Sequence, residues 1–123
     1  MIRIAIVGCG SVSRHYLSDL KTCEYAQVVA LCDVVEERAR ERAEQFGISR
    51  IFTDLDEMLS QCEFDMLINL TSMQQHYSVN LKALQAGNHV LSEKPFATTL
   101  EEARTLIETA RQHGVNLWAA PTV

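Results

Sequence analysis

The first thirteen residues, MIRIAIVGCGSVS (residues 1–13), decide the fold of this chain. Five of them form a short apolar run that is rich in β-branched side chains, namely Ile2, Ile4, Ala5, Ile6 and Val7. Such a run is typical of a parallel strand that helices bury on both faces. It ends at Gly8-Cys9-Gly10, which predicts a tight turn into a helix. A turn of this kind brings backbone N–H groups close to a bound phosphate.

The spacing G-x-G-x-x-S matches the dinucleotide-binding fingerprint only in part, because its third position is Ser13 and not glycine. A small residue can still fill the packing role of that glycine. Ser11 or Ser13 is expected to cap the helix, which fades near Thr22. Its inner face is predicted at i, i+4 and i+8, comprising Val12, Tyr16 and Leu20. The turn alone therefore does not identify a ligand.

Length and composition place the chain among single globular domains. It has 123 residues, of which 47% are hydrophobic and 22% charged, with a formal net charge of -5. The negative charge and the lack of a basic cluster argue against nucleic-acid binding. No apolar run reaches the ~20 residues that span a bilayer, and the N-terminus lacks the features of a secretory signal. We therefore expect a cytoplasmic protein without nucleic-acid or membrane partners.

The four cysteines, Cys9, Cys23, Cys32 and Cys62, show no C-x-x-C spacing and no histidines in ligand register. A disulfide framework and a metal site are both disfavoured. We expect small buried hydrophobic residues in a reducing compartment. Cys9 lies near a predicted helix N-terminus, which can lower the pKa of a thiol. Loop filler is favoured there over a reactive thiol.

Strand and helix patterns alternate along the whole chain. After the first unit, strands are predicted at 28–32, 51–52, 64–70, 89–91 and 115–119. Helices are predicted from about 36 to 46, around 55–59, from about 75 to 86, and from 99 to 114. Repeated βαβ units imply right-handed crossovers. The chain is therefore predicted to form one α/β domain over residues 1–123, a doubly wound, mostly parallel Rossmann sheet of about six strands with helices on both faces.

Helix boundaries can be predicted from local residues. Asp54 is an expected N-cap, and Thr99 with Glu102 has the T-x-x-E spacing of a capping box. Gly47, Gly87 and Gly114 are placed to end helices. The second helix is expected to bury Ala39, Ala43 and Phe46, and the last one Leu100, Ala103, Leu106, Ile107 and Ala110.

In open parallel sheets, ligands bind beyond the carboxyl ends of the strands. The residues that follow the predicted strands are Gly8 to Ser13, Asp33, Thr71 to His76, Glu93 to Pro95, and Ala119 to Thr122. Asp33 follows Ser13 by 20 residues, at the end of the second strand. An acid at this place binds the hydroxyls of an adenine ribose and repels a 2′-phosphate, which favours NAD over NADP.

Val34 and Val35 add no arginine that would reverse the preference for NAD. Two alternatives to a dinucleotide site stay open at this point. Asp33 as the plain end of a strand is the less favoured reading. A methyltransferase also has a glycine-rich first loop with an acid one strand later, so a discriminating motif must come from further along.

That motif is Glu93-Lys94-Pro95, in the string AGNHVLSEKPFATTLEEA (residues 86–103). This string resembles the Gfo/Idh/MocA family of nicotinamide-dependent oxidoreductases, which carry A-G-K-H-V-x-x-E-K-P at this place. Asn88 replaces the lysine of that pattern. The resemblance covers the whole chain, from the glycine turn through Asp33 to the E-K-P motif. Nothing in a methyltransferase explains E-K-P.

The resemblance implies roles for the E-K-P residues. Lys94 would be the catalytic residue, lying near the nicotinamide and the reacting carbon and assisting proton transfer as hydride moves. A partly desolvated ammonium can lose its proton. Glu93 would organise the site, and Pro95 would follow a cis bond, as is typical of the family. The less favoured reading is a solvated turn with an ion pair.

Thr71 to His76 matches the family's T-P-N-x-x-H stretch less well, because Ser72 and Met73 replace the proline and the asparagine. Thr71 would still lie by the cofactor. His76 would lie at the nicotinamide or substrate end, with a plain surface histidine as the equal alternative. His15, His89 and His113 are expected to be structural.

The resemblance predicts an oxidoreductase that transfers hydride between a nicotinamide cofactor and a sugar, polyol or related small substrate. The cofactor is expected to be NAD, with NADP less favoured. The residues expected to bind it are Gly8, Gly10, Ser11, Val12, Asp33, Thr71, Ser72, His76, Glu93, Lys94 and Pro95. A non-catalytic dinucleotide-binding sensor or regulatory module is the alternative.

The family's second domain, which supplies the substrate pocket and most of the oligomer interface, is absent from these residues. We therefore expect NAD(H) binding with little or no turnover from this chain alone. Apolar surface near Trp118 and Pro121 is expected to drive self-association.

Overall fold

The computed structural model describes residues 1–120; residues 121–123 lie outside the described part. Within residues 1–120 the chain forms six strands, β1 (Ile2–Val7), β2 (Ala26–Cys32), β3 (Ile51–Phe52), β4 (Met66–Asn69), β5 (His89–Ser92) and β6 (Leu117–Ala119). The helices are α1 (Ser11–Lys21), α2 (Glu36–Phe46), α3 (Leu55–Gln61), α4 (His76–Gln85) and α5 (Leu100–His113), with a 3₁₀ turn, η1 (Met73–Gln75), before α4. The predicted alternation is confirmed.

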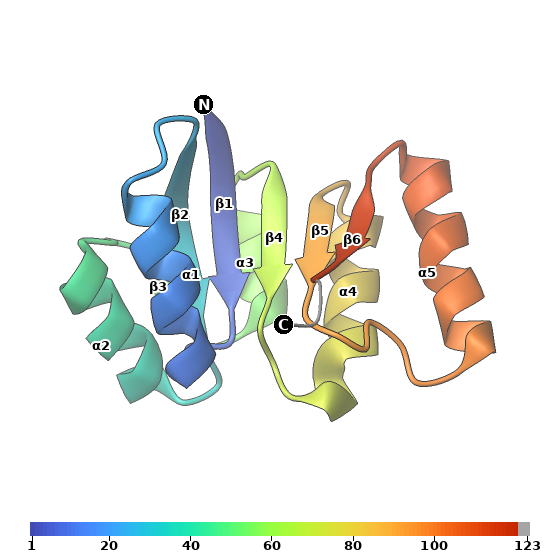
Figure 1. The fold of residues 1–123 in the computed structure, drawn as a ribbon, viewed down its shortest axis with the longest axis horizontal. Coiled ribbons are helices and arrows are strands. Elements are labelled where there is room, and N and C mark those ends of the chain that lie inside the picture. Colours follow the sequence, from blue (N-terminus) through green and yellow to red (C-terminus); the bar gives the residue numbers. More distant parts are fainter. Residues whose placement is uncertain (121–123) are drawn as a thin grey trace.

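All strands pair in parallel, in the order β3-β2-β1-β4-β5-β6. Helices α1 and α2 lie on one face of the sheet, and α3, α4 and α5 lie on the other (Figure 1). The strand order reverses at β1, because the chain builds outward first through β2 and β3 and then through β4. This reversal opens a crevice at the carboxyl ends of β1 and β4, where ligands of open α/β sheets bind.

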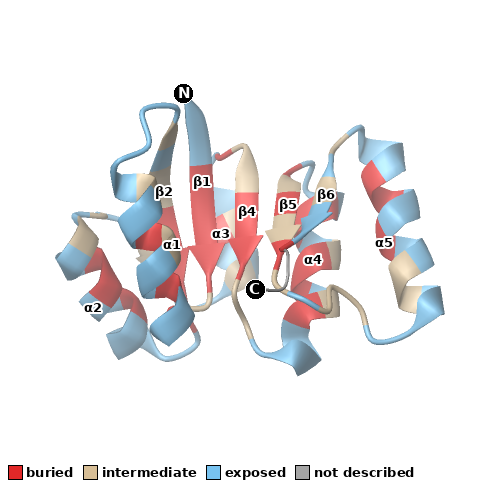
Figure 2. Cartoon of the chain, in the orientation of Figure 1, coloured by how far each residue is buried: buried red, intermediate tan, exposed pale blue. Residues whose placement is uncertain are grey.

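The core consists of two apolar layers, one on each face of the sheet. Ile4, Ile6 and Leu31 pack beneath α1 and α2, and Ala5, Leu67 and Val90 pack against α4 and α5. Alternation along β1 directs successive side chains to opposite layers. Figure 2 shows the buried residues concentrated in the central strands and on the inner faces of the helices. This doubly covered sheet explains the continuous apolar run of the first strand.

The predicted helix caps are partly confirmed. Asp54 accepts a hydrogen bond from the Asp56 amide at 3.1 Å, and Thr99 Oγ1 accepts one from the Glu102 amide at 3.1 Å. The Glu102 carboxylate, however, accepts from the amide and hydroxyl of Thr98, at 3.0 and 2.8 Å. Helices α2 and α5 end at glycine, as predicted.

The cap predicted for α1 is wrong, and its predicted inner face is partly wrong. Its N-cap is Gly10, and neither Ser11 nor Ser13 caps it with a side chain. The fully buried residues are Ser13 and Leu17, and Tyr16 and Leu20 pack partly buried against the same core layer, whereas Val12 is 45% exposed. Apolar periodicity missed part of this face because one of its central positions is a buried polar residue.

The stripe predicted for α5 is also partly wrong, since Leu100 and Ile107 are exposed and Thr109 is buried beside Leu106 and Ala110. The Thr109 hydroxyl donates to the Thr105 carbonyl at 2.7 Å, which satisfies it inside the helix. The second helix matches its prediction, with Ala39 and Ala43 buried.

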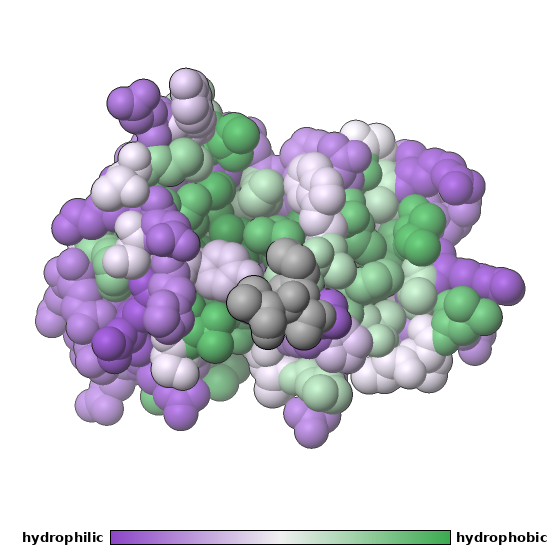
Figure 3. Space-filling view, viewed as in Figure 1, coloured by the Kyte–Doolittle hydropathy of each residue, from purple (hydrophilic) through white to green (hydrophobic). Residues whose placement is uncertain are grey.

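No helix of residues 1–120 covers β5 and β6 on the face that carries α1 and α2 (Figure 1). Figure 3 shows hydrophobic residues gathered across the middle of this face. Trp118 on the edge strand β6 is 44% exposed, and its ring lies 6.0 Å from that of His89. Pro121, the other residue expected in this apolar surface, lies outside the described residues.

Candidate functional site

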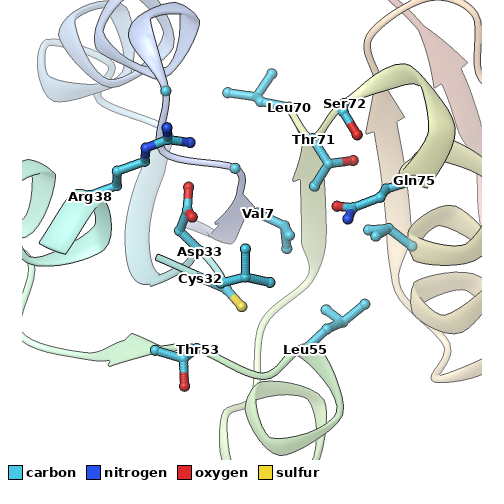
Figure 4. Close-up of a pocket in the computed structure, with 14 residues that line it drawn as sticks. Val7, Cys32, Asp33, Arg38, Thr53, Leu55, Leu70, Thr71, Ser72 and Gln75 are labelled. Atoms are coloured by element: carbon cyan, nitrogen blue, oxygen red, sulfur yellow. The ribbon is translucent and has the colours of Figure 1, made fainter. Parts of the chain in front are cut away.

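A cavity of about 310 Å³ lies at the carboxyl ends of β1, β2 and β4 (Figure 4). Five of the residues predicted to bind the cofactor line it, namely Gly8, Gly10, Asp33, Thr71 and Ser72. Ser11, Val12, His76, Glu93, Lys94 and Pro95 are not among its lining residues. The cavity therefore joins three of the predicted strand exits at the point where the strand order reverses.

Gly8 brings the exits of β1 and β4 together. Its φ is +97°, and a Cβ built there would lie 2.5 Å from the carbonyl carbon of Leu70. On the other side, the Gly8 amide donates to the Cys32 carbonyl at 2.8 Å. No side chain fits between these backbones, so the fold itself requires glycine at this position.

Gly10 is different, because nothing in the described structure requires a glycine there. Its φ is -77°, which suits any residue, and a Cβ built on it would meet no atom within 4 Å. The position caps α1 and lines the cavity, so a side chain would fill the space in front of the helix N-terminus. The first amides of a helix lack intrahelical partners and favour an anion. This open cradle fits the pyrophosphate of a dinucleotide.

Asp33 connects two of the exits. The residue is 7% exposed, and its carboxylate accepts hydrogen bonds from the Cys9 amide and the Val35 amide, both at 2.8 Å. These bonds hold the carboxylate at the cavity wall, with the remaining lone pairs available to a ligand hydroxyl.

Cys9 is a buried residue of the turn and not an activated thiol. Burial, followed by the nearby Asp33 carboxylate, raises the pKa of Cys9 to about 12. This opposes the lowered pKa that a helix N-terminus alone would produce. Loop filler is thus the correct reading. Cys32 and Cys62 are buried as predicted, whereas Cys23 is exposed, contrary to the prediction.

Arg38 is a lining residue that the sequence reasoning missed. It lies in the first turn of α2, and its guanidinium points to the same side of the cavity as the Asp33 carboxylate (Figure 4). The sequence prediction considers only Val34 and Val35 after Asp33. A helix that starts just beyond them places the side chains of its first turn near the strand exits, and this signal identifies Arg38.

Two buried asparagines support the exits of β4 and β5, and the sequence reasoning missed both. Asn69 Oδ1 accepts from the amide and hydroxyl of Thr71, at 3.1 and 2.6 Å, and Asn69 Nδ2 donates to Asn80 Oδ1 at 2.8 Å. Asn80 Nδ2 donates to Ser92 Oγ at 3.0 Å and to the Phe96 carbonyl at 3.2 Å. The network connects the Thr71 loop to the loop that carries Lys94.

His76 is buried and connects the same two loops. Its Nδ1 lies 2.7 Å from the carbonyl oxygen of Pro95, and its Nε2 lies 2.7 Å from that of Thr71. The side chain is 3% exposed, so the alternative of a surface histidine is wrong. The chain's own carbonyl groups occupy both ring nitrogens, so His76 acts here as a brace between strand exits.

The E-K-P loop leaves Lys94 at the surface. The bond before Pro95 is cis, as the resemblance implied. Glu93 accepts from the Tyr16 hydroxyl at 3.2 Å, and burial followed by Glu93 raises the pKa of Tyr16. Lys94 is exposed, and none of the ion pairs within residues 1–120 includes it. The expected partial desolvation of the ammonium is not present in this chain.

Two further properties concern the described part of the chain. No group of three histidine, cysteine, aspartate or glutamate side chains there could hold a metal ion. None of its helices is both long and apolar enough to cross a membrane.

Comparison with known proteins agrees with this geometry. The model of the Gfo/Idh/MocA oxidoreductase family, described as an NAD-binding Rossmann fold, matches residues 2–120. The chain belongs to this family. It is 38% identical over 113 residues to D-apiose dehydrogenase from Paraburkholderia graminis. The aligned region covers 92% of this chain and 30% of that enzyme.

Two other family members differ in the cofactor that their names mention. The scyllo-inositol 2-dehydrogenase (NADP(+)) of Bacillus subtilis is 32% identical, over 98% of this chain and 37% of that enzyme. The WlbA dehydrogenase from Bordetella pertussis, solved with NADH and UDP-GlcNAcA, superposes with a TM-score of 0.91 at 32% identity, over 97% of this chain and 36% of that one. The chain thus spans about a third of the length of these relatives.

Proposed function

We propose that this chain is the NAD(H)-binding domain of an oxidoreductase that transfers hydride between the cofactor and a hydroxyl or carbonyl of a sugar, polyol or related small substrate. The observation that carries the proposal is the cavity at the strand reversal, which is lined both by Gly10, where a side chain would meet open space, and by the buried Asp33. When bound, the nicotinamide ring supplies the hydride or accepts it.

Different residues of the chain then bind different parts of the dinucleotide. The turn from Gly8 to Val12 binds the pyrophosphate through backbone N–H groups at the start of α1. Asp33 accepts hydrogen bonds from the adenine ribose. Thr71 and Ser72 contact the part of the cofactor that extends from the ribose toward the nicotinamide. Their position in the cavity wall supports this assignment.

Lys94 is proposed as the catalytic residue at the nicotinamide end. Its ammonium would hydrogen-bond the reacting oxygen of the substrate and stabilise the charge that develops there. Its exposure supports contact with groups outside these 123 residues. Glu93, Pro95 and His76 would contribute by holding the Lys94 loop, through the contacts to Tyr16 and Thr71.

NAD is proposed as the preferred cofactor. The Asp33 carboxylate repels a 2′-phosphate, and its buried position strengthens that repulsion. Arg38 on the same wall would attract the phosphate, so the preference is a balance between two charges. Relatives named for NADP and solved with NADH fit such a balance.

The substrate pocket is proposed to be formed by residues that correspond to the part of the relatives that this chain does not match. That part is about two thirds of their length. We further propose a cytoplasmic location. The apolar surface at Trp118 is proposed to drive self-association, and light scattering that finds only monomer at high concentration would contradict this.

Calorimetric titration tests the cofactor assignment. NADH, NADPH and S-adenosylmethionine are titrated in turn into the folded chain. Saturable binding of NADH at one site, with weaker NADPH and no S-adenosylmethionine, is expected. Binding of S-adenosylmethionine without NADH would overturn the proposal in favour of a methyltransferase.

A second experiment separates an enzyme from a non-catalytic sensor. In a longer chain that carries the family's substrate domain, Lys94→Ala is expected to abolish turnover while leaving NADH affinity within about twofold, because the exposed side chain lies outside the cavity wall. Turnover that survives the substitution would contradict the role of Lys94.

A further inference from the structure

Ser13 is the one departure from the glycine fingerprint, and the structure gives it partners. The residue is fully buried at the start of α1. Its hydroxyl donates to the carbonyl oxygen of Gly10, which also accepts from the Ser13 amide at 3.2 Å. The serine thus occupies the packing position of a third glycine and adds a polar contact to the turn.

Arg42 reaches the same turn from α2. Its side chain is almost fully buried, which is unusual for arginine in an amphipathic helix. The guanidinium donates from Nε to Ser13 Oγ at 3.1 Å and from Nη2 to the Gly10 carbonyl at 3.4 Å. Nη1 donates to the neutral amide oxygen of Gln45 at 3.1 Å.

Among residues 1–120, no buried carboxylate lies within 4 Å of the Arg42 guanidinium. The carboxylate within 4 Å belongs to Glu41, at 3.7 Å, and the Glu41 side chain is 67% exposed. Water screens such a partner, whereas the guanidinium itself is desolvated. A buried positive charge therefore lies behind the turn that lines the cavity with Gly8 and Gly10.

The contact to Gly10 also acts on the peptide bond that follows. The Gly10 carbonyl shares its amide group with the N–H of Ser11, the first residue of α1. A carbonyl that accepts from a guanidinium and a hydroxyl is polarised, and this strengthens the donor at the other end of the same amide.

We infer that Arg42 and Ser13 form a positioning pair for the phosphate-binding turn, and that the buried charge of Arg42 stabilises the pyrophosphate of the bound dinucleotide. This inference rests on the proposed binding of NAD(H). Arg42 acts through the Gly10 peptide and through its electrostatic field, without touching the cofactor.

The test compares a ligand with phosphates and one without. NADH and adenosine are titrated separately into wild type, Arg42→Leu and Arg42→Lys. Arg42→Leu is expected to weaken NADH binding about tenfold, while adenosine affinity stays within about twofold. Arg42→Lys keeps the charge and is expected to recover part of the loss. A purely structural role would weaken both ligands equally.

Arg40→Leu is the matched control. Arg40 lies on the same helix, but it is exposed and pairs with Glu36 at 3.2 Å. Its replacement removes one positive charge from the domain without altering the turn, so NADH affinity is expected to stay within about twofold. Equal weakening by Arg40→Leu and Arg42→Leu would assign the effect to net charge and overturn the inference.

Ser13→Ala keeps the test decisive if Arg42→Leu does not fold. It removes one oxygen and is expected to weaken NADH binding about threefold, with adenosine unchanged. Unchanged NADH affinity in folded Ser13→Ala and Arg42→Lys would overturn the inference. Loss of the proposed function itself is recognised separately, because wild type would then fail to bind NADH.

Discussion

Gly8 and Gly10 stand two residues apart in one turn, yet they are glycine for different reasons. A side chain at Gly8 would collide with the Leu70 backbone, whereas one at Gly10 would meet open space. The first constraint comes from the fold, and we propose that the second comes from the bound cofactor. The G-x-G pattern alone cannot separate them, because both demands produce the same residue.

Substitution separates the two glycines. Gly8→Ala forces a side chain into a left-handed backbone and a 2.5 Å contact, so we expect the free energy of unfolding to fall by about 2–3 kcal/mol or more. Gly10→Val should leave it within about 1 kcal/mol but abolish NADH binding. Urea titration and calorimetry measure the two effects. Tight NADH binding by Gly10→Val would contradict the cradle.

The pair of Asp33 and Arg38 predicts how cofactor preference can be changed. Asp33→Ser removes the repelling carboxylate while a hydroxyl can still accept from the Cys9 amide. NADPH affinity relative to NADH is expected to rise about tenfold, because Arg38 then acts alone on the 2′-phosphate. Arg38→Gln in the same background should reverse the gain. If neither substitution changes the affinity for NADPH relative to NADH, the result would contradict this arrangement.

The buried thiols predict a loss of stability in alkali. Burial, followed by Asp33, raises the pKa of Cys9 and of Cys32 from 9.0 to about 12. Between these values the unfolded chain releases thiol protons that the native chain retains. The free energy of unfolding should therefore fall as pH rises from 9 toward 12. Urea titrations at several pH values measure it, with Cys9→Ala/Cys32→Ala as the control that removes the thiol contribution.

Helix α4 holds two strand exits in place, the one after β4 and the one after β5. Asn80 and His76 on this helix bond to the Phe96 and Pro95 carbonyls, and Asn69 on β4 joins them to Thr71. A fully bonded buried polar network specifies one arrangement of its members, because each group is costly to leave unpaired. The loop that carries Lys94 is therefore set by the helix before it.

Removing Asn80 tests this role of α4. Asn80→Ala leaves Asn69 Nδ2, Ser92 Oγ and the Phe96 carbonyl short of a partner, so the free energy of unfolding should fall by about 2–4 kcal/mol. The rate of hydrogen exchange should rise most at the amides of residues 93, 94, 96 and 97. The control is Asn116→Ala, at an exposed position. A uniform rise of exchange across the sheet would contradict a local role.

Helix ends and buried helix faces differ in how well the sequence predicts them. Asp54 and Thr99 were identified as N-caps because their partners lie two or three residues away. The buried face of α1 was identified only in part, because Ser13 is buried against Arg42 of another helix, 29 residues further along the chain. The periodicity of apolar residues predicts which apolar side chains are buried. It does not predict a buried pair of polar side chains that come from two different helices.

At the scale of the whole molecule, the predicted sheet brings the exits at Gly10, Asp33 and Thr71 around one cavity, as the doubly wound topology requires. Parallel strands with right-handed crossovers leave few alternatives for where these exits meet. The position of Lys94 relative to the cavity did not follow from the sequence. It depends on Tyr16 and His76, whose contacts to the loop span 77 and 19 residues.

We propose that a nicotinamide dinucleotide binds at the strand reversal beside β1. Amide chemical shifts of the chain, measured by NMR during an NADH titration, test it most directly. We expect saturable shifts concentrated at residues 8–12, at Asp33 and at residues 71–72, and we expect Gly10→Val to abolish them. Saturable shifts confined to another surface, or no shifts with the chain folded, would contradict it.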